Sequence, residues 1–134
     1  MYSNQRLVAI RANKKDVEIV AALLNSIVSI LIVELNGVSR SLGALDLNAD
    51  FFKTKMKILN PALLTDKQRV NIISKFSILS KRQIQDFSTE YQNKDRVDFD
   101  TEVLKAYGLN PKVLSQLYLL LTETIRNRIE MKNR

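Results

Sequence analysis

The sequence lacks two residue types on which much enzyme chemistry depends. None of its 134 residues is cysteine, which excludes disulfide bonds and thiolate chemistry. None is histidine, so the commonest general base and the commonest zinc ligand are both missing. Serine is common, but without histidine or a Gly-x-Ser-x-Gly turn no pattern indicates an activated hydroxyl. An independent enzyme is therefore the weakest of the functional hypotheses.

Glycine and proline are scarce as well. Three glycines and two prolines are too few for a disordered or fibrous chain, and 46% hydrophobic residues is typical of one helix-rich globular domain. Gly37, Gly43 and Gly108 are too scattered for a nucleotide-binding loop. The longest apolar run, residues 21–33, falls short of the roughly 20 residues of a membrane span, so we expect a core helix and no membrane partner. The polar first residues predict no signal peptide, and we expect a cytoplasmic protein.

Positive charge, by contrast, is abundant. The chain has 21 basic and 14 acidic residues, which gives a formal net charge of +7. Residues 1–60 hold eight basic against five acidic groups, and residues 101–134 hold six against three, so both ends are basic. Such a charge favours a polyanionic partner, although a solvated surface without a partner fits the same composition.

Hydrophobic spacing predicts the secondary structure. Apolar residues recur at three- and four-residue steps through residues 14–36, which predicts one long helix closed by Gly37. A short strand is predicted at residues 5–11, and extended segments at residues 44–47 and 51–59. Further helices are predicted from Thr65 with Val70 facing inward, around residues 84–91, from Asp100 or Thr101 to Tyr107, and from Pro111 onward.

These elements predict an α+β fold that is mainly helical. In it a small antiparallel sheet packs on the long helix, and a helical C-terminal subdomain follows. Residues 1–60 would form a strand–helix–strand unit and residues 61–134 the helical subdomain, together in one compact domain.

Four basic residues are the candidates for nucleic-acid binding. Lys53, Lys55 and Lys57 alternate with apolar residues, so an extended backbone would place three ammonium groups on one face. That face could follow a phosphate backbone, or the lysines could instead protect an exposed strand from edge pairing. Arg40, in the loop between Gly37 and Gly43, could reach a phosphate or a guanine edge, or have no partner.

Three carboxylates are the only candidates for metal binding or acid–base chemistry. Asp95, Asp98 and Asp100 lie close together in the sequence. Asp98 and Asp100 precede a predicted helix start, where acidic caps are expected, so a structural role is favoured over a metal site.

Several short motifs resemble the end of the target-recognition region of adenine-specific (N6) DNA methyltransferases from bacterial restriction-modification systems. The likeness covers most of the chain. It is carried by residues 23–26 (LLNS), 34–37 (ELNG) with 43–45 (GAL), 57–61 (KILNP), 107–109 (YGL) and 125–128 (IRNR).

The resemblance implies a non-catalytic DNA-recognition module. In that family the S-adenosylmethionine site and the Asn-Pro-Pro-aromatic motif lie upstream, so no cofactor is expected in this chain, and the parent protein would be an S-adenosylmethionine-dependent DNA adenine methyltransferase. The implied partners are double-stranded DNA and the upstream methyltransferase domain or a second copy of the chain. The alternative is a helical interaction or dimerisation module that does not contact DNA, in which the helices after Pro61 dock on a partner.

Overall fold

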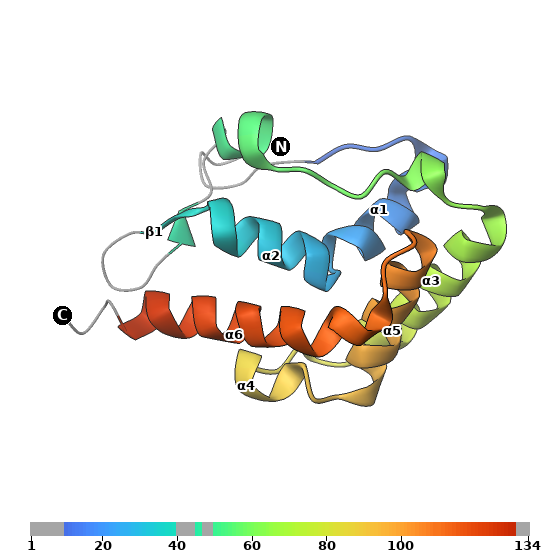
Figure 1. Cartoon of the computed structure of the whole chain (residues 1–134). Helices are drawn as coiled ribbons and strands as arrows, with labels where there is room; N and C mark the ends of the chain where they lie inside the picture. The colour runs from blue at the N-terminus through green and yellow to red at the C-terminus, as the bar shows by residue number, and fades with distance from the viewer. Residues whose placement is uncertain (1–9, 40–44, 47–49, 131–134) are drawn as a thin grey trace.

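Helices form nearly all the regular structure of the protein. A computed structural model describes residues 10–39, 45–46 and 50–130 (Figure 1). The α-helices are α1 (Val17–Leu24), α2 (Ile27–Asn36), α3 (Asp66–Ser80), α4 (Phe87–Glu90), α5 (Lys94–Ala106) and α6 (Leu114–Glu130). Single helical turns are η1 (Lys14–Asp16), η3 (Phe51–Lys55), η4 (Pro61–Leu63) and η5 (Pro111–Val113).

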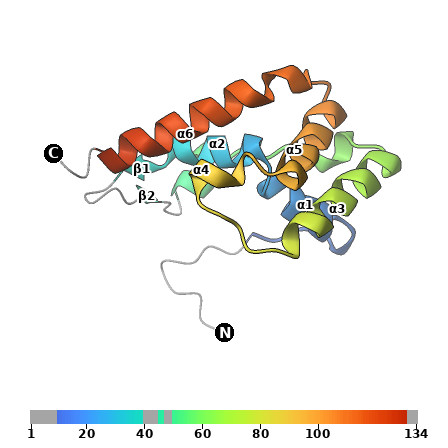
Figure 2. The same cartoon turned by 90° about the horizontal axis from the view of Figure 1, so that it is seen from below.

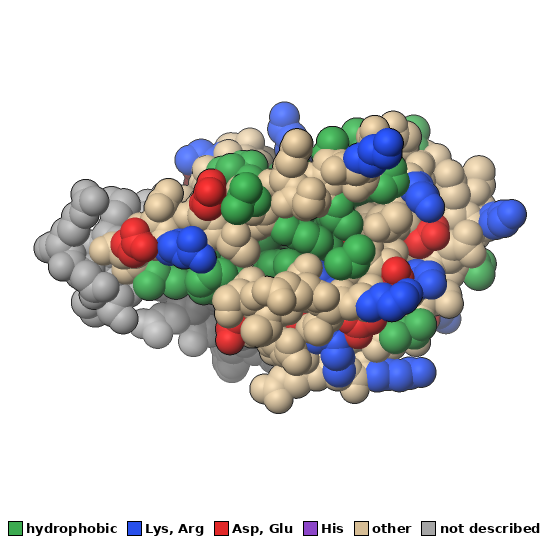
Figure 3. All heavy atoms as spheres, turned by 60° about the horizontal axis from the view of Figure 1, so that its bottom comes forward, with side chains coloured by type: hydrophobic (Ala, Val, Ile, Leu, Met, Phe, Trp, Pro, Cys, Tyr) green, Lys and Arg blue, Asp and Glu red, His purple; other side chains and the backbone are tan. Residues whose placement is uncertain are grey.

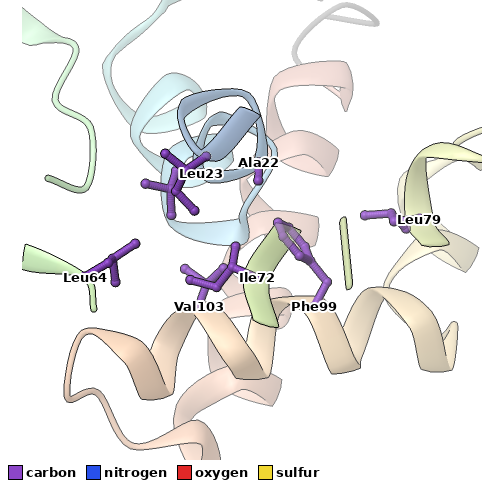
Figure 4. Close-up of a cluster of buried hydrophobic side chains, with 8 residues drawn as sticks. Ala22, Leu23, Leu64, Ile72, Leu79, Phe99 and Val103 are labelled. Carbon is purple, nitrogen blue, oxygen red and sulfur yellow. The ribbon is translucent and has the colours of Figure 1, made fainter. Parts of the chain in front are cut away.

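Two hydrophobic clusters share helix α5. The first joins α1, α3 and α5, where Ile72 and Phe99 face Leu23 (Figure 4). The second joins α2, α5 and α6, and is built on residues such as Leu104 and Leu121. Helices α2 and α6 lie side by side, and the short helix α4 lies below α6 in the view of Figure 1 and beside it in Figure 2. Helix α5 is thus the element that both halves of the core require.

The predicted α+β class is wrong. Pairing between extended segments is limited, among the described residues, to the two-residue segments β1 (Val38–Ser39) and β2 (Leu45–Asp46), which are antiparallel. The segment expected to be a strand at 51–59 begins instead with the turn η3, because Phe51 is buried and the Met56 N–H donates to its carbonyl across five residues, at 2.8 Å. Residues 5–9 of the predicted first strand lie outside the described residues, and residues 10 and 11 belong to no strand.

The predicted continuous helix at 14–36 is also wrong, because it breaks at Asn25 and Ser26. Helices α1 and α2 meet there at a bend of 68°. Ser26 is the N-cap of α2, and its hydroxyl oxygen accepts from the Ser29 N–H. The apolar period continues through the break, so periodicity alone does not locate it.

Several helix boundaries agree with the sequence prediction. Thr65 and Gln68 form a reciprocal capping box at the start of α3, and the turn η5 begins at Pro111. Gly108 follows α5 with φ of 72°, a left-handed conformation that favours glycine.

Two sequence predictions for the helices after Pro61 are wrong. Helix α5 begins at Lys94, six residues before the predicted Asp100, so Asp98 and Asp100 lie inside the helix and do not precede it. In helix α3, Val70 is 65% exposed, and Ile72 is buried in its place.

Candidate functional site

Most of the buried polar side chains of the described residues gather around the break between α1 and α2. The Ile27 N–H, at the first turn of α2, donates to Asp100 Oδ1 at 2.9 Å. The Asn25 carbonyl accepts from Arg96 Nη1 at 2.7 Å. The hydroxyls of Ser26 and Ser29 both donate to the Leu23 carbonyl, at 2.7 Å. Two side chains of α5 therefore satisfy backbone groups that a continuous helix would have satisfied internally.

Arg96 extends this site into a network of charges that is buried at Arg96 and Glu90 and partly exposed at Arg82 and Asp95. Its Nε donates to Glu90 Oε1 at 3.1 Å, and both side chains are 2% exposed. Arg82 binds the same Glu90 through two nitrogens at 2.9 Å and also binds Asp95 through Nε at 2.6 Å. Two arginines and two carboxylates thus connect the end of α3 with α4 and α5, and every buried side-chain N or O atom of the described residues has a hydrogen-bond partner.

The pKa values of the two buried carboxylates of this region, Asp100 and Glu90, shift in opposite directions. Burial raises the pKa of Asp100 to about 6, although hydrogen bonds from the Tyr118 hydroxyl and the Ile27 N–H, together with the charge of Arg96, act to lower it. Burial also opposes ionisation of Glu90, but hydrogen bonds from Arg82, the Gln85 N–H and Arg96 outweigh it and lower the pKa of Glu90. The difference arises because Glu90 accepts hydrogen bonds from two arginines, whereas the donors to Asp100 are the neutral Ile27 N–H and Tyr118 hydroxyl.

Aromatic rings enclose the network. Tyr91 and Tyr118 stack with ring centroids 4.8 Å apart, and the Tyr118 hydroxyl donates to Asp100 Oδ2 at 2.7 Å. The Arg96 guanidinium lies 5.9 Å from the ring centroids of both Tyr91 and Phe99. The site is therefore a closed arrangement of rings and ion pairs that holds α2, α5 and α6 together.

The carboxylates at 95, 98 and 100 do not converge on a common point. Asp95 binds Arg82, Asp98 binds Lys94 at 2.6 Å, and Asp100 faces α2 and α6. In the described part of the chain no three acidic side chains are grouped so that they could hold a metal ion.

The three predicted lysines are all exposed, but they do not share one face of a strand. Lys53 and Lys55 lie on the turn η3, and Lys57 follows it in a segment without regular structure. Residues two apart on a helical turn point in different directions, so the alternating pattern does not align Lys53 with Lys55. Arg40 lies outside the described residues.

Arginines and lysines play different roles in the described structure. Arg69 binds Asp16, Arg128 binds Glu34, and Arg82 and Arg96 both bind Glu90. Lysine, by contrast, forms a single ion pair among the described residues, between Lys94 and Asp98. These four guanidinium groups, which can bind two acceptors at once, hold elements together, whereas Arg11, Arg126 and most of the described lysines are exposed.

Two grooves are candidates for ligand binding. One, of about 420 Å³, lies between α1 and α3 and includes Val17, Ala21, Ile73 and Phe76. The other, of about 350 Å³, lies between α4 and α6. Figure 3 shows hydrophobic side chains gathered in a hollow on the face that carries these two helices. The groove between α4 and α6 is lined by Phe87, Ser88, Tyr91, Gln92, Ser115, Tyr118, Leu119, Thr122 and Arg126.

Sequence reasoning missed Glu90, Arg96 and Tyr118 as members of one site. Arg96 and Asp100 lie on the same stripe of the helix as the apolar Phe99 and Val103, and a charge buried there needs partners, which was the available signal. Those partners, however, come from segments 6 to 73 residues away in the sequence.

No single helix of the described residues is long and apolar enough to cross a membrane. No protein-family model, curated protein or solved structure matches the chain.

Proposed function

We propose that the chain is a non-catalytic DNA-binding module, which contacts the phosphate backbone of double-stranded DNA through Lys53, Lys55 and Lys57. One observation carries the proposal. All three side chains are exposed within five residues of sequence, and none has an ion-pair partner in the described structure. The resemblance to the recognition region of adenine-specific DNA methyltransferases supplies the identity of the polyanion.

The separation of roles between arginine and lysine supports this proposal. Because Arg69, Arg82, Arg96 and Arg128 are all paired with carboxylates, the exposed positive charge of the described residues comes mainly from lysines. A lysine ammonium on a flexible stem binds phosphate as a point charge and does not need the extended backbone that the sequence suggested. Such contacts provide affinity and leave the recognised sequence to other residues.

The test is duplex binding measured by fluorescence anisotropy over a series of salt concentrations. We expect the Lys53→Gln, Lys55→Gln, Lys57→Gln triple variant to bind more weakly and to show a flatter salt dependence. Each phosphate contact contributes about 0.9 to the slope of log affinity against log salt, so loss of three contacts flattens it by about 2.7.

A second triple variant controls for net charge. Lys67, Lys105 and Lys112 are exposed and lie on other elements, and their change to glutamine removes the same three charges. This control variant should retain most of the wild-type slope. If both triple variants flatten the slope equally, the net charge alone attracts DNA and the assignment to residues 53–57 is wrong.

A specific observation also favours a second candidate, the helical interaction module. Leu63 is 70% exposed and Val70 is 65% exposed, on the two elements that follow Asn60. A contiguous patch of such side chains would mark a protein–protein contact. A concentration-dependent dimer in sedimentation velocity that Val70→Ser dissociates, with no binding to duplex, would replace the DNA proposal by this one.

A further inference from the structure

The carboxylate of Asp100 is completely buried at the bend between α1 and α2. Its Oδ1 accepts from the Ile27 N–H at 2.9 Å and its Oδ2 from the Tyr118 hydroxyl at 2.7 Å. Because Ile27 begins α2 and Tyr118 lies on α6, opening the bend to water would hydrate Asp100. The protonation of Asp100 and the stability of the bend are therefore linked.

Charged and titratable groups face Asp100 from three elements. Arg96, on the same helix, attracts the ionised carboxylate, and Glu90 of α4 repels it. Tyr118 of α6 donates a hydrogen bond to it, and Tyr91 of α4 stacks on Tyr118. Helix α2 contributes only the backbone N–H of Ile27. Arg96 itself donates hydrogen bonds to Glu90 and to the Asn25 carbonyl, and it acts on Asp100 through its charge.

We propose that the α1–α2 bend is an acid-strengthened joint, in which Asp100 takes up a proton on mild acidification and so stabilises the closed form against an open form with a hydrated carboxyl. Both neighbours donate to the ionised carboxylate, so one of them must turn to make room for the proton. The unprotonated oxygen continues to accept from Ile27, and the new O–H donates to the Tyr118 oxygen, whose own hydrogen turns away from Asp100.

The direction of the effect follows from the two protonation equilibria. Burial raises the pKa of Asp100 to about 6 in the closed form, and a hydrated aspartate has a value near 3.8. The closed form thus binds the proton more tightly, gains stability as the pH falls through about 6, and loses that gain as the pH rises again. The sequence contains no histidine, and the pKa values of Glu90 and Asp95 are lowered, so these groups do not mask the effect between pH 7 and pH 5.

Native-state hydrogen exchange followed by NMR tests the proposal. The reporters are the amides of Ile27, which donates to Asp100, and Ser29, which donates to Ser26. After correction for intrinsic exchange rates, we expect the opening equilibrium constant to fall about tenfold from pH 7 to pH 5, as pKa values of about 6 and 3.8 require. An opening constant that is the same at both pH values would overturn the proposal.

Two substitutions separate Asp100 from its neighbours. Asp100→Asn keeps the acceptor for Ile27 but cannot ionise, so its opening constant should not change between pH 7 and pH 5. Asp98→Asn, on the same helix and paired with exposed Lys94, should keep the full change. A pH response that persists in Asp100→Asn would assign the effect to another group and contradict the proposal.

Direct titration keeps the proposal testable even if Asp100→Asn does not fold. The ¹³C shift of the Asp100 carboxyl in the wild-type protein should titrate near pH 6, and a midpoint near 3.8 would contradict the proposal. Tyr118→Phe removes a hydrogen bond from both forms of Asp100, but the bond to the ionised carboxylate is the stronger of the two, so the midpoint should move upward. A purely structural role of Tyr118 would leave the midpoint unchanged.

Discussion

The segment 51–57 and helix α5 both carry several charges within a few residues, but they place them in opposite environments. Lys53, Lys55 and Lys57 are exposed, whereas Arg96 and Asp100 are buried. The difference does not come from the local pattern. It comes from partners on other elements, because Glu90, Asn25, Ile27 and Tyr118 supply the hydrogen bonds that make burial of Arg96 and Asp100 possible. A charged residue without such partners remains in water.

The largest expected effect is that of Arg96→Met. This change leaves Glu90 buried with Arg82 as its remaining cationic partner and removes the donor to the Asn25 carbonyl. We expect a loss of about 3–5 kcal/mol in the free energy of unfolding, measured by urea denaturation. Lys94→Met, which breaks the exposed pair with Asp98, should cost about 0.5 kcal/mol or less. Equal losses for the two variants would mean that the buried Arg96–Glu90 pair contributes no more to stability than the exposed Lys94–Asp98 pair.

The next largest effect is expected for Tyr118→Phe. The variant removes one of the two hydrogen bonds that the Asp100 carboxylate accepts and should cost about 2 kcal/mol at pH 7. Tyr107→Phe is the matched control, since the Tyr107 hydroxyl donates to the exposed carbonyl of Asn60. We expect a cost of about 1 kcal/mol or less there, and a larger cost for Tyr107→Phe would contradict the ranking.

A smaller effect is expected for Ser26→Ala at the bend. The hydroxyl caps α2, but the Leu23 carbonyl keeps a second donor in the Ser29 hydroxyl. Thermal and urea unfolding should show a loss of about 1 kcal/mol. Thr65→Ala at the exposed capping box of α3 should lose a similar amount, because each change removes one N-cap. No loss for Ser26→Ala would show that the Asp100 and Arg96 bonds alone define the bend.

The smallest effect is expected for the triple change of Lys53, Lys55 and Lys57 to glutamine. These exposed side chains form no ion pair with any described residue, so the free energy of unfolding should change by about 0.5 kcal/mol or less. The same variant is expected to weaken DNA binding. If the triple variant also unfolds the protein, the loss of DNA binding would have a structural cause. The lysines of residues 51–57 would then contribute to stability as the charged residues of α5 do, and the contrast between the two segments would be wrong.

Local signals predicted the helices after Pro61 well. The capping box at Thr65, the glycine after α5 and the proline at the last helix all depend on residues within a few positions of one another. In the helix predicted from Pro111 onward, Leu114, Tyr118 and Leu121 are buried at helical spacing. The start of α5 was missed although Asn93 precedes it, a residue type that is favoured at N-caps, and Asp95 lies in its first turn.

The features that depend on distant contacts were not predictable from periodicity. The bend at Ser26 requires Asp100 and Arg96, which lie more than 70 residues along the chain. The alternation around Lys53 fitted a strand, but burial of Phe51 and the turn that follows it take precedence over the pattern. For the proposed DNA site, the sequence identified exposed lysines and misjudged the backbone that carries them.

The contacts at the bend also have a kinetic consequence. The bonds from Ile27 to Asp100 and from Arg96 to Asn25 close loops of 73 and 71 residues, whereas the bonds within α1 and α2 are local. Loop closure on that scale costs entropy before the contact is gained, so the bend should form late in folding. Until α5 docks, the break between α1 and α2 has only its local contacts, such as the cap at Ser26, and lacks the bonds from Arg96 and Asp100. Substitutions of Asp100 should therefore accelerate unfolding more than they slow folding.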